Sequence, residues 1–257
     1  MLKGIIIFIL AFSFSTLAYP QTPVSSLLKE ITLFKRHNAG KWTITWNPQK
    51  TQILLLSKEL NYRNKKRKHT PILHNQAALA MAFLKQNAKL FKLTTNLHDL
   101  QISRADDDGL VLIRQTFNDL PVIHPRGLNG QIHLRIDSLE GIYYVYNGYM
   151  PHLSVSTTPL LSADEIIAIA QEDTRKNRML TYTKTIGVHP IPLESQVEPF
   201  FTQKPKPELI IYIDKEKPPV LAYTFIQDAL NRLVHLKYFI DANKGEILLA
   251  FDPIIYD

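Results

Sequence analysis

One order of elements occurs twice along the chain, and it is the strongest constraint on the fold. Residues 76–93 carry apolar side chains at helical spacing and are followed by short extended runs between turn-forming residues. A second helical stretch opens at Ser162 and is again followed by extended runs, from 208 to 251. Each helix must lay its apolar face on the sheet that the strands form. The sequence therefore predicts an α+β fold with two tandem helix-plus-antiparallel-sheet subdomains.

Turn-forming residues place the individual elements. In the first unit the expected strands are 42–46, 52–57, 100–105, 110–117, 120–123, 131–137 and 141–146. Asp108 and Gly109 favour a tight turn, because glycine accepts a positive φ and aspartate bonds its own backbone. Ser162 and Glu165 match a capping box at the start of the second helix. The expected strands of the second unit are 208–214, 220–227, 236–241 and 246–251.

The N-terminus has the features of an export signal. Lys3 precedes an apolar run that continues to Phe14, and small residues end at Ala18. The run is shorter than the roughly 20 apolar residues of a membrane span. We expect cleavage after Ala18, a secreted or periplasmic protein, and no stable membrane association. The expected organisation is a signal peptide at 1–18, a first domain at 19–150 with an N-terminal hairpin, and a second at 151–257 with a C-terminal tail.

Composition excludes some partners and sites. The chain has no cysteine, which rules out disulfides and thiolate zinc sites. Its formal net charge of +7 includes a basic run at 63–68 (RNKKRK). Such a run is typical of nucleic-acid binding or of a solvated loop. We favour the loop because the chain is marked for export, and expect no nucleic-acid partner.

A search for chemistry finds no catalytic motif. The sequence lacks H-E-x-x-H, G-x-S-x-G and a phosphate-binding glycine loop. The aspartates at 106–108 lack the alternating spacing of a calcium loop, so a turn is favoured over a metal site. His124, His133 and His152 form a second, weak metal candidate, against the alternative that they are ordinary strand and loop residues. We expect no catalytic residue, no metal and no cofactor, and thus no enzyme.

Four tyrosines form an aromatic cluster in the sequence: Tyr143, Tyr144, Tyr146 and Tyr149. They are numerous enough for a binding surface. In the alternative interpretation, alternate tyrosines pack on the helix and the others face solvent, because side chains alternate along a strand.

The order of motifs resembles a known family. The helix at 77–91, the hairpin strand GLVLIRQTF (109–117), Leu120-Pro121-Val122, QIHL (131–134) and VYNG (145–148) resemble the fungalysin/thermolysin propeptide (FTP) motif. The last third, with LLSADE (160–165), ELIIY (208–212), LAY (221–223) and YFIDANKGEIL (238–248), resembles a PepSY domain. Together they cover roughly residues 40–252. The resemblance implies two cystatin-like or PepSY-like subdomains.

Three departures from the family pattern stand out. Asp119 occupies the place of a family-like glycine, an extra Pro-Arg-Gly (125–127) interrupts the following strand, and the insert at 181–207 is long. Contacts of individual residues therefore cannot be carried over from the family.

In thermolysin-like proteases this region is a pro-segment that helps the enzyme fold and blocks its cleft. The resemblance implies a secreted, non-catalytic protein that binds a secreted zinc metalloprotease as inhibitor, folding chaperone or both. The expected contact segment is extended and apolar: Phe251, Asp252, Pro253, Ile254, Ile255 and Tyr256. An extended segment can add to a cleft by backbone hydrogen bonds. Two alternatives stay open: the non-catalytic half of a split or truncated metalloprotease precursor, and a secreted binding module for an unrelated protein.

Overall fold

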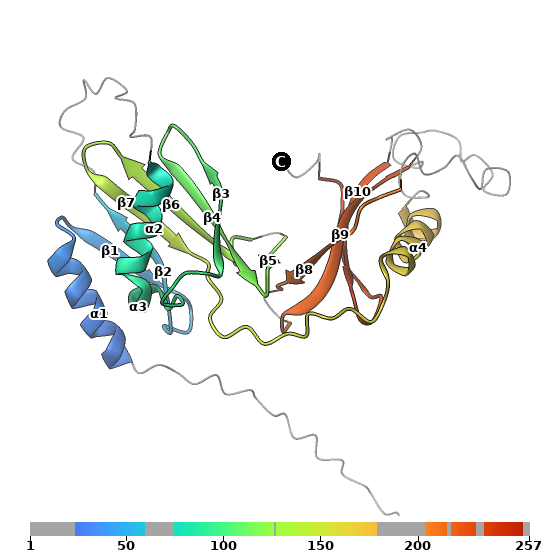
Figure 1. Cartoon of the computed structure of the whole chain (residues 1–257), viewed down its shortest axis with the longest axis horizontal. Coiled ribbons are helices and arrows are strands. Elements are labelled where there is room, and N and C mark those ends of the chain that lie inside the picture. The colour runs from blue at the N-terminus through green and yellow to red at the C-terminus, as the bar shows by residue number, and fades with distance from the viewer. Residues whose placement is uncertain are drawn as a thin grey trace, which may run out of the picture.

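The computed structural model describes residues 24–59, 75–125, 127–178, 204–214, 217–229 and 234–253. Within these residues four α-helices, one π-helical turn and eleven strands form an α+β fold, as the sequence predicts. In Figure 1, α1 and α4 lie at opposite sides of the molecule, with the strands between them. No helix in the described ranges is long and apolar enough to cross a membrane.

The first half is an antiparallel sheet. Its strands are β1 (Trp42–Trp46), β2 (Ile53–Lys58), β3 (Leu100–Ala105), β4 (Leu110–Phe117), β6 (Gln131–Asp137) and β7 (Gly141–Asn147). They lie in the order β1-β2-β7-β6-β4, with β3 paired to β4. The predicted hairpins β1–β2, β3–β4 and β6–β7 are therefore confirmed.

One face of this sheet is covered by helices α1 (Val24–His37), α2 (Gln76–Gln86) and α3 (Ala88–Phe91). Leu84 and Phe91 from the helices are fully buried against strand residues such as Ile113 and Leu134. Alternate strand residues supply this core because successive side chains point to opposite faces. The other face of the sheet therefore carries the remaining alternate residues.

The single helix predicted over 76–93 is wrong in its length and continuity. The structure divides it at Asn87 into α2 and α3 and ends it at Phe91. The side-chain amide of Asn87 donates to the Phe83 carbonyl at 2.8 Å. Side-chain amides that bond nearby backbone carbonyls compete with regular helix bonding. Lys92 then takes a left-handed conformation (φ 58°), which stops the helix.

Helix α1 was not expected from the sequence. Its buried side chains are Leu27, Ile31 and Phe34, at the i, i+4, i+7 spacing of one helical face. Phe34 meets Trp42 of β1 edge-on, with ring centroids 5.1 Å apart. The helix thus closes the core at the β1 end of the sheet.

The second half repeats the arrangement with α4 (Ala163–Asp173) and strands β8 (Glu208–Tyr212), β9 (Val220–Ala229), β10 (Val234–Asp241) and β11 (Ile247–Phe251). The predicted capping box is present: Glu165 N donates to Ser162 Oγ at 3.3 Å, and Ser162 N donates to Glu165 Oε2 at 2.8 Å. Ile166 and Ala170 of α4 are buried on this sheet. A π-helical turn, Thr174–Arg178, follows the helix.

A short strand joins the two halves. Strand β5 (Leu120–Ile123) is antiparallel to β4 and parallel to β8, where Val122 lies opposite Ile211 and Ile123 opposite Tyr212. The backbone N–H of Ile213 also donates to the Ile123 carbonyl at 2.9 Å. Strands from both halves therefore form one continuous order, β1-β2-β7-β6-β4-β5-β8-β9-β10-β11.

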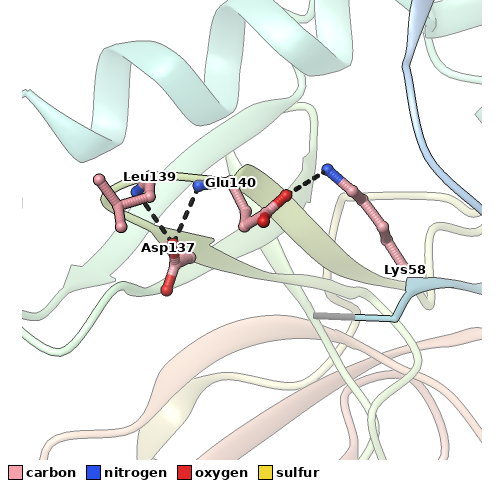
Figure 2. A network of polar contacts seen from close by, with 4 residues as sticks. All are labelled: Lys58, Asp137, Leu139 and Glu140. Atoms are coloured by element: carbon pink, nitrogen blue, oxygen red, sulfur yellow. Dashed lines mark hydrogen bonds and ion pairs between the residues drawn. The ribbon is translucent and has the colours of Figure 1, made fainter. Parts of the chain in front are cut away.

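The β6–β7 turn is tied to β2 by the polar contacts drawn in Figure 2. Asp137 Oδ1 accepts hydrogen bonds from the backbone N–H groups of Leu139 and Glu140, each at 2.9 Å. The carboxylate of Glu140 pairs with Lys58 Nζ at 2.9 Å. The carboxylates of Asp137 and Glu140 are thus used within the molecule.

Candidate partner-binding surface

The predicted contact segment begins at the last strand. Phe251 is the final residue of β11, opposite Lys237 of β10, and Asp252 and Pro253 follow it. The remaining predicted residues, Ile254, Ile255 and Tyr256, lie outside the described part of the chain.

Phe251 belongs to an apolar surface on the face of the second sheet opposite α4. We call this surface the C-terminal face. Its members are Ile123, Ile210, Tyr212, Val220, Ala222, Phe239, Leu248, Leu249 and Phe251. Four of them are buried and the others keep part of their surface accessible. The face thus runs from β5, at the junction of the two halves, to the strand that leads into the predicted contact segment.

Aromatic rings order the C-terminal face. Phe239 lies at its centre, 5.6 Å from Tyr212 and 6.3 Å from Phe251, measured between ring centroids. The rings of Phe239 and Phe251 are stacked at 9°. Lys237 Nζ lies 5.6 Å from the centroid of Phe239, within the range of a cation–π interaction. These contacts fix the ring of Phe251 just before the tail leaves the sheet.

Both faces of the second sheet are apolar, so a single strand contributes residues to the core under α4 and to the C-terminal face. In β9, Leu221, Tyr223 and Phe225 point toward α4, whereas Val220 and Ala222 belong to the C-terminal face. A sheet covered on one side only would alternate apolar and polar residues. The central residues of this second face are already buried, so its half-buried residues, which include Val220 and Phe251, are the ones that can contact another surface.

The outer edge of this sheet is also apolar. Within the described residues β11 pairs with β10 alone, and its sequence, ILLAF, has no charge and no proline. Natural edge strands are usually protected by charges, proline or bulges. Strand β1, at the other end of the strand order, is likewise free of charge and proline (WTITW), and the pairings of β1 and of β11 each contain a bulge. An edge strand of this kind can accept an added strand through its backbone groups, and β11 is the one that leads into the predicted contact segment.

The two metal candidates do not assemble into a site. No group of three or more His, Asp or Glu residues that could hold a metal is found in the described ranges. His124 is buried beside Gly127, whereas His133 lies on β6 and His152 has a left-handed backbone (φ 61°). The aspartates at 106–108 form the β3–β4 turn, closed by a bond from Gly109 N to the Asp106 carbonyl at 3.0 Å.

The tyrosine cluster is divided between two environments. Tyr144 and Tyr146 lie on the sheet face without helices, where each keeps part of its surface accessible. Tyr149 is buried, and its hydroxyl donates to Asp99 Oδ2 at 2.5 Å. Burial, followed by this hydrogen bond, raises the pKa of Tyr149. Tyr149 is thus a structural residue, while Tyr144 and Tyr146 are available for contact.

Sequence reasoning named the tail and missed the C-terminal face to which Phe251 belongs. The signal was present in ELIIY (208–212) and LAYTF (221–225), where neighbouring residues are apolar instead of alternating with polar ones. Continuous apolar strands indicate burial on both faces. Sequence alone could not show which face receives the helix.

No protein-family model matches the chain, and no curated protein matches it. Among solved structures the chain is similar to the Bacillus megaterium YpeB C-terminal domain, with a TM-score of 0.40 and 10% sequence identity. That similarity covers 90% of this chain and 97% of the other.

Proposed function

We propose that this chain is a secreted, non-catalytic, propeptide-like protein that binds a thermolysin-like zinc metalloprotease as inhibitor, folding chaperone or both. The observation that carries the proposal is the continuity of the C-terminal face with the tail. The last strand, β11, has an apolar edge, contributes Phe251 to the face, and leads directly into residues 252–257.

The C-terminal face and the tail are suited to different kinds of contact with a partner. Phe251 keeps part of its surface accessible and is held by stacking on the buried ring of Phe239, and aromatic side chains bury large areas in interfaces. The tail is expected from its sequence to be extended, and an extended segment can add its backbone to a strand or cleft, with alternate side chains filling pockets. Together they would hold a partner against the sheet and direct the tail toward the cleft of the enzyme.

A truncation tests the role of the tail. The mature chain and a variant lacking residues 252–257 are compared as inhibitors of a secreted zinc metalloprotease from the same organism. We expect the truncation to raise the inhibition constant at least tenfold, about 1.4 kcal/mol of binding free energy, while the unfolding midpoint stays unchanged. A matched control is Leu160→Ala, which removes a side chain that is 78% exposed in the segment before α4.

An unchanged inhibition constant for the truncated chain would argue against the tail as the contact segment. A pull-down from culture supernatant then separates the remaining alternatives. Recovery of a thermolysin-like protease supports inhibition or chaperoning. Its clear absence favours a binding module for an unrelated protein.

A further inference from the structure

The first sheet has a second surface that the tail does not involve. Strand registers place two rows side by side on the face without helices: Leu55–Tyr146–His133–Leu112 and Ser57–Tyr144–Arg135–Leu110. Arg114 lies beside them, opposite Gln131. We call the set Leu55, Leu112, Arg114, His133, Arg135, Tyr144 and Tyr146 the Tyr–Arg face. Helices α2 and α3, which lie in front of the strands in Figure 1, cover the opposite side of this sheet.

The Tyr–Arg face is accessible and positively charged. Each of its seven residues keeps part of its surface exposed to solvent. No Asp or Glu occupies the positions of either row between β2 and β4 or of the neighbouring pair. Asp106, which lies beside Leu110 in the β3–β4 turn, pairs with Arg104, and Asp108 accepts from the Leu110 N–H. The nearby carboxylates of Asp137 and Glu140 are engaged in the contacts of Figure 2. Arg114 and Arg135 form no ion pair within the part of the chain that the structure describes.

Contacts within the face hold part of it in place. A ring nitrogen of His133, Nε2, lies 2.9 Å from Gln131 Oε1 on the same strand. The His133 and Tyr146 rings lie 5.8 Å apart between centroids, on neighbouring strands. Because their rotamers are restricted before binding, less side-chain entropy is lost when a partner docks.

The residue types favour a protein as the occupant. Tyrosine and arginine are enriched among the residues that dominate protein interfaces, whereas lysine, aspartate and glutamate are depleted there. Binding to a nucleic-acid backbone or an anionic membrane depends instead on many cations, each adding a small increment. Two arginines among tyrosines and leucines do not supply such a cluster.

We propose that the Tyr–Arg face is a second docking surface, which binds an acidic patch of the same partner protease that the tail contacts. The proposal rests on the proposed function, because that function supplies the partner. Arg114 and Arg135 pair with carboxylates of the partner, while Tyr144 and Tyr146 pack against its surface. Opposite charges across an interface raise the association rate and select the partner.

The test is a calorimetric titration of the mature chain with an inactive variant of a secreted zinc metalloprotease from the same organism. The chain variants are Arg135→Glu, the double variant Arg114→Glu/Arg135→Glu, and Tyr144→Ala. Arg36→Glu is the matched control, since Arg36 is exposed on α1, on the other side of the sheet, and the change in charge is identical. Thermal unfolding of each variant checks that it folds. If the double variant does not fold, the single variant Arg135→Glu, at an exposed site, replaces it in the titration.

We expect the double variant to raise the dissociation constant at least tenfold and Arg36→Glu to change it less than twofold. The wild-type constant should also rise with salt, and the double variant should lose most of this dependence. Equal binding by wild type and the Tyr–Arg variants would overturn this inference and leave the proposed function intact.

Two further results would overturn the inference in other ways. If the wild-type chain does not bind the protease, the proposed function is wrong, and the protease is then not the partner of the Tyr–Arg face either. Binding of the chain to phosphatidylserine vesicles or to heparin that the double variant abolishes, with protease binding unchanged, would assign the face to a polyanion instead.

Discussion

The side-chain amide of Gln115 forms both backbone hydrogen bonds of Met150. Gln115 Nε2 donates to the Met150 carbonyl and Met150 N donates to Gln115 Oε1, each at 2.8 Å. Gln115 is on β4, and Met150 follows β7, so the pair fixes the point where the chain leaves the first sheet. The N–H and carbonyl groups of Met150 are thus paired by one side chain and not by a neighbouring strand.

Replacing Gln115 with alanine should therefore destabilise the fold. Gln115 is buried, so the Met150 N–H and carbonyl would lose their partners in a site with little water. We expect a loss of about 2 kcal/mol in the free energy of unfolding, measured by chemical denaturation. Gln101→Ala, on the exposed edge strand β3, is the control and should change this free energy by less than about 0.5 kcal/mol. Equal effects of the two changes would show that the Gln115–Met150 pair is not a stabilising contact.

Tyr149 should make stability depend on alkaline pH. Burial and the bond to Asp99 raise the pKa of Tyr149 in the folded chain. The unfolded chain ionises this phenol near its usual value of about 10, so the unfolded state binds fewer protons above that pH. The contribution of Tyr149 is therefore present below about pH 10 and declines as the pH rises further.

The variant Tyr149→Phe isolates this contribution. It should lose about 1–3 kcal/mol near neutral pH, because Asp99 loses a buried donor, and it should show a shallower decline of stability at alkaline pH. Denaturation at a series of pH values and a near-ultraviolet absorbance titration measure the two effects. The same alkaline slope in wild type and variant would exclude Tyr149 as its source.

Two glycines of the first half should respond differently to alanine. A Cβ on Gly148 would lie 2.1 Å from the Leu128 carbonyl oxygen and 2.7 Å from that of Gln131, both backbone atoms that cannot move independently. A Cβ on Gly141 meets nothing within 4 Å, and only its positive φ of 69° opposes the change. We expect Gly148→Ala to cost about 3 kcal/mol and Gly141→Ala about 1 kcal/mol in unfolding free energy. The order of the two denaturation midpoints tests this, and a lower midpoint for Gly141→Ala would contradict it.

Asp119 should be replaceable by glycine with a gain in stability. Asn118 and Asp119 form the two-residue turn between β4 and β5, with φ values of 48° and 64°. Glycine is preferred after asparagine in such turns because it has no steric penalty at positive φ. We expect Asp119→Gly to raise the unfolding free energy by about 0.5–1 kcal/mol, since relief of strain outweighs the added freedom of the unfolded chain. Asn118→Ala should lower it, and thermal unfolding of both variants would decide.

Much of the fold follows from local patterns. The Asp108-Gly109 turn, the capping box at Ser162 and the alternation along β4 and β6 all predict elements that the structure contains. The same reasoning could have found α1, because Leu27, Ile31 and Phe34 repeat at helical spacing. The break at Asn87 depends on one side-chain bond to the backbone, which competes closely with continued helix.

The pairing of β5 with β8 and the residues of the C-terminal and Tyr–Arg faces could not be predicted from the sequence, for a different reason. Strands β5 and β8 pair over only two positions, Val122–Ile211 and Ile123–Tyr212, through backbone groups that every residue has. The placement of Arg135 beside Tyr144 likewise depends on register between strands, which no local pattern records. The tail stays a prediction from the sequence, where an apolar segment follows the last expected strand.

The most direct test of the proposed function is a titration of the purified mature chain against a secreted zinc metalloprotease from the same organism. Proteolytic activity of the folded enzyme and the yield of active enzyme after refolding are measured together. The proposed function predicts that equimolar chain lowers the activity, raises the refolding yield, or does both. Unchanged activity and unchanged yield at a large excess of chain would contradict it.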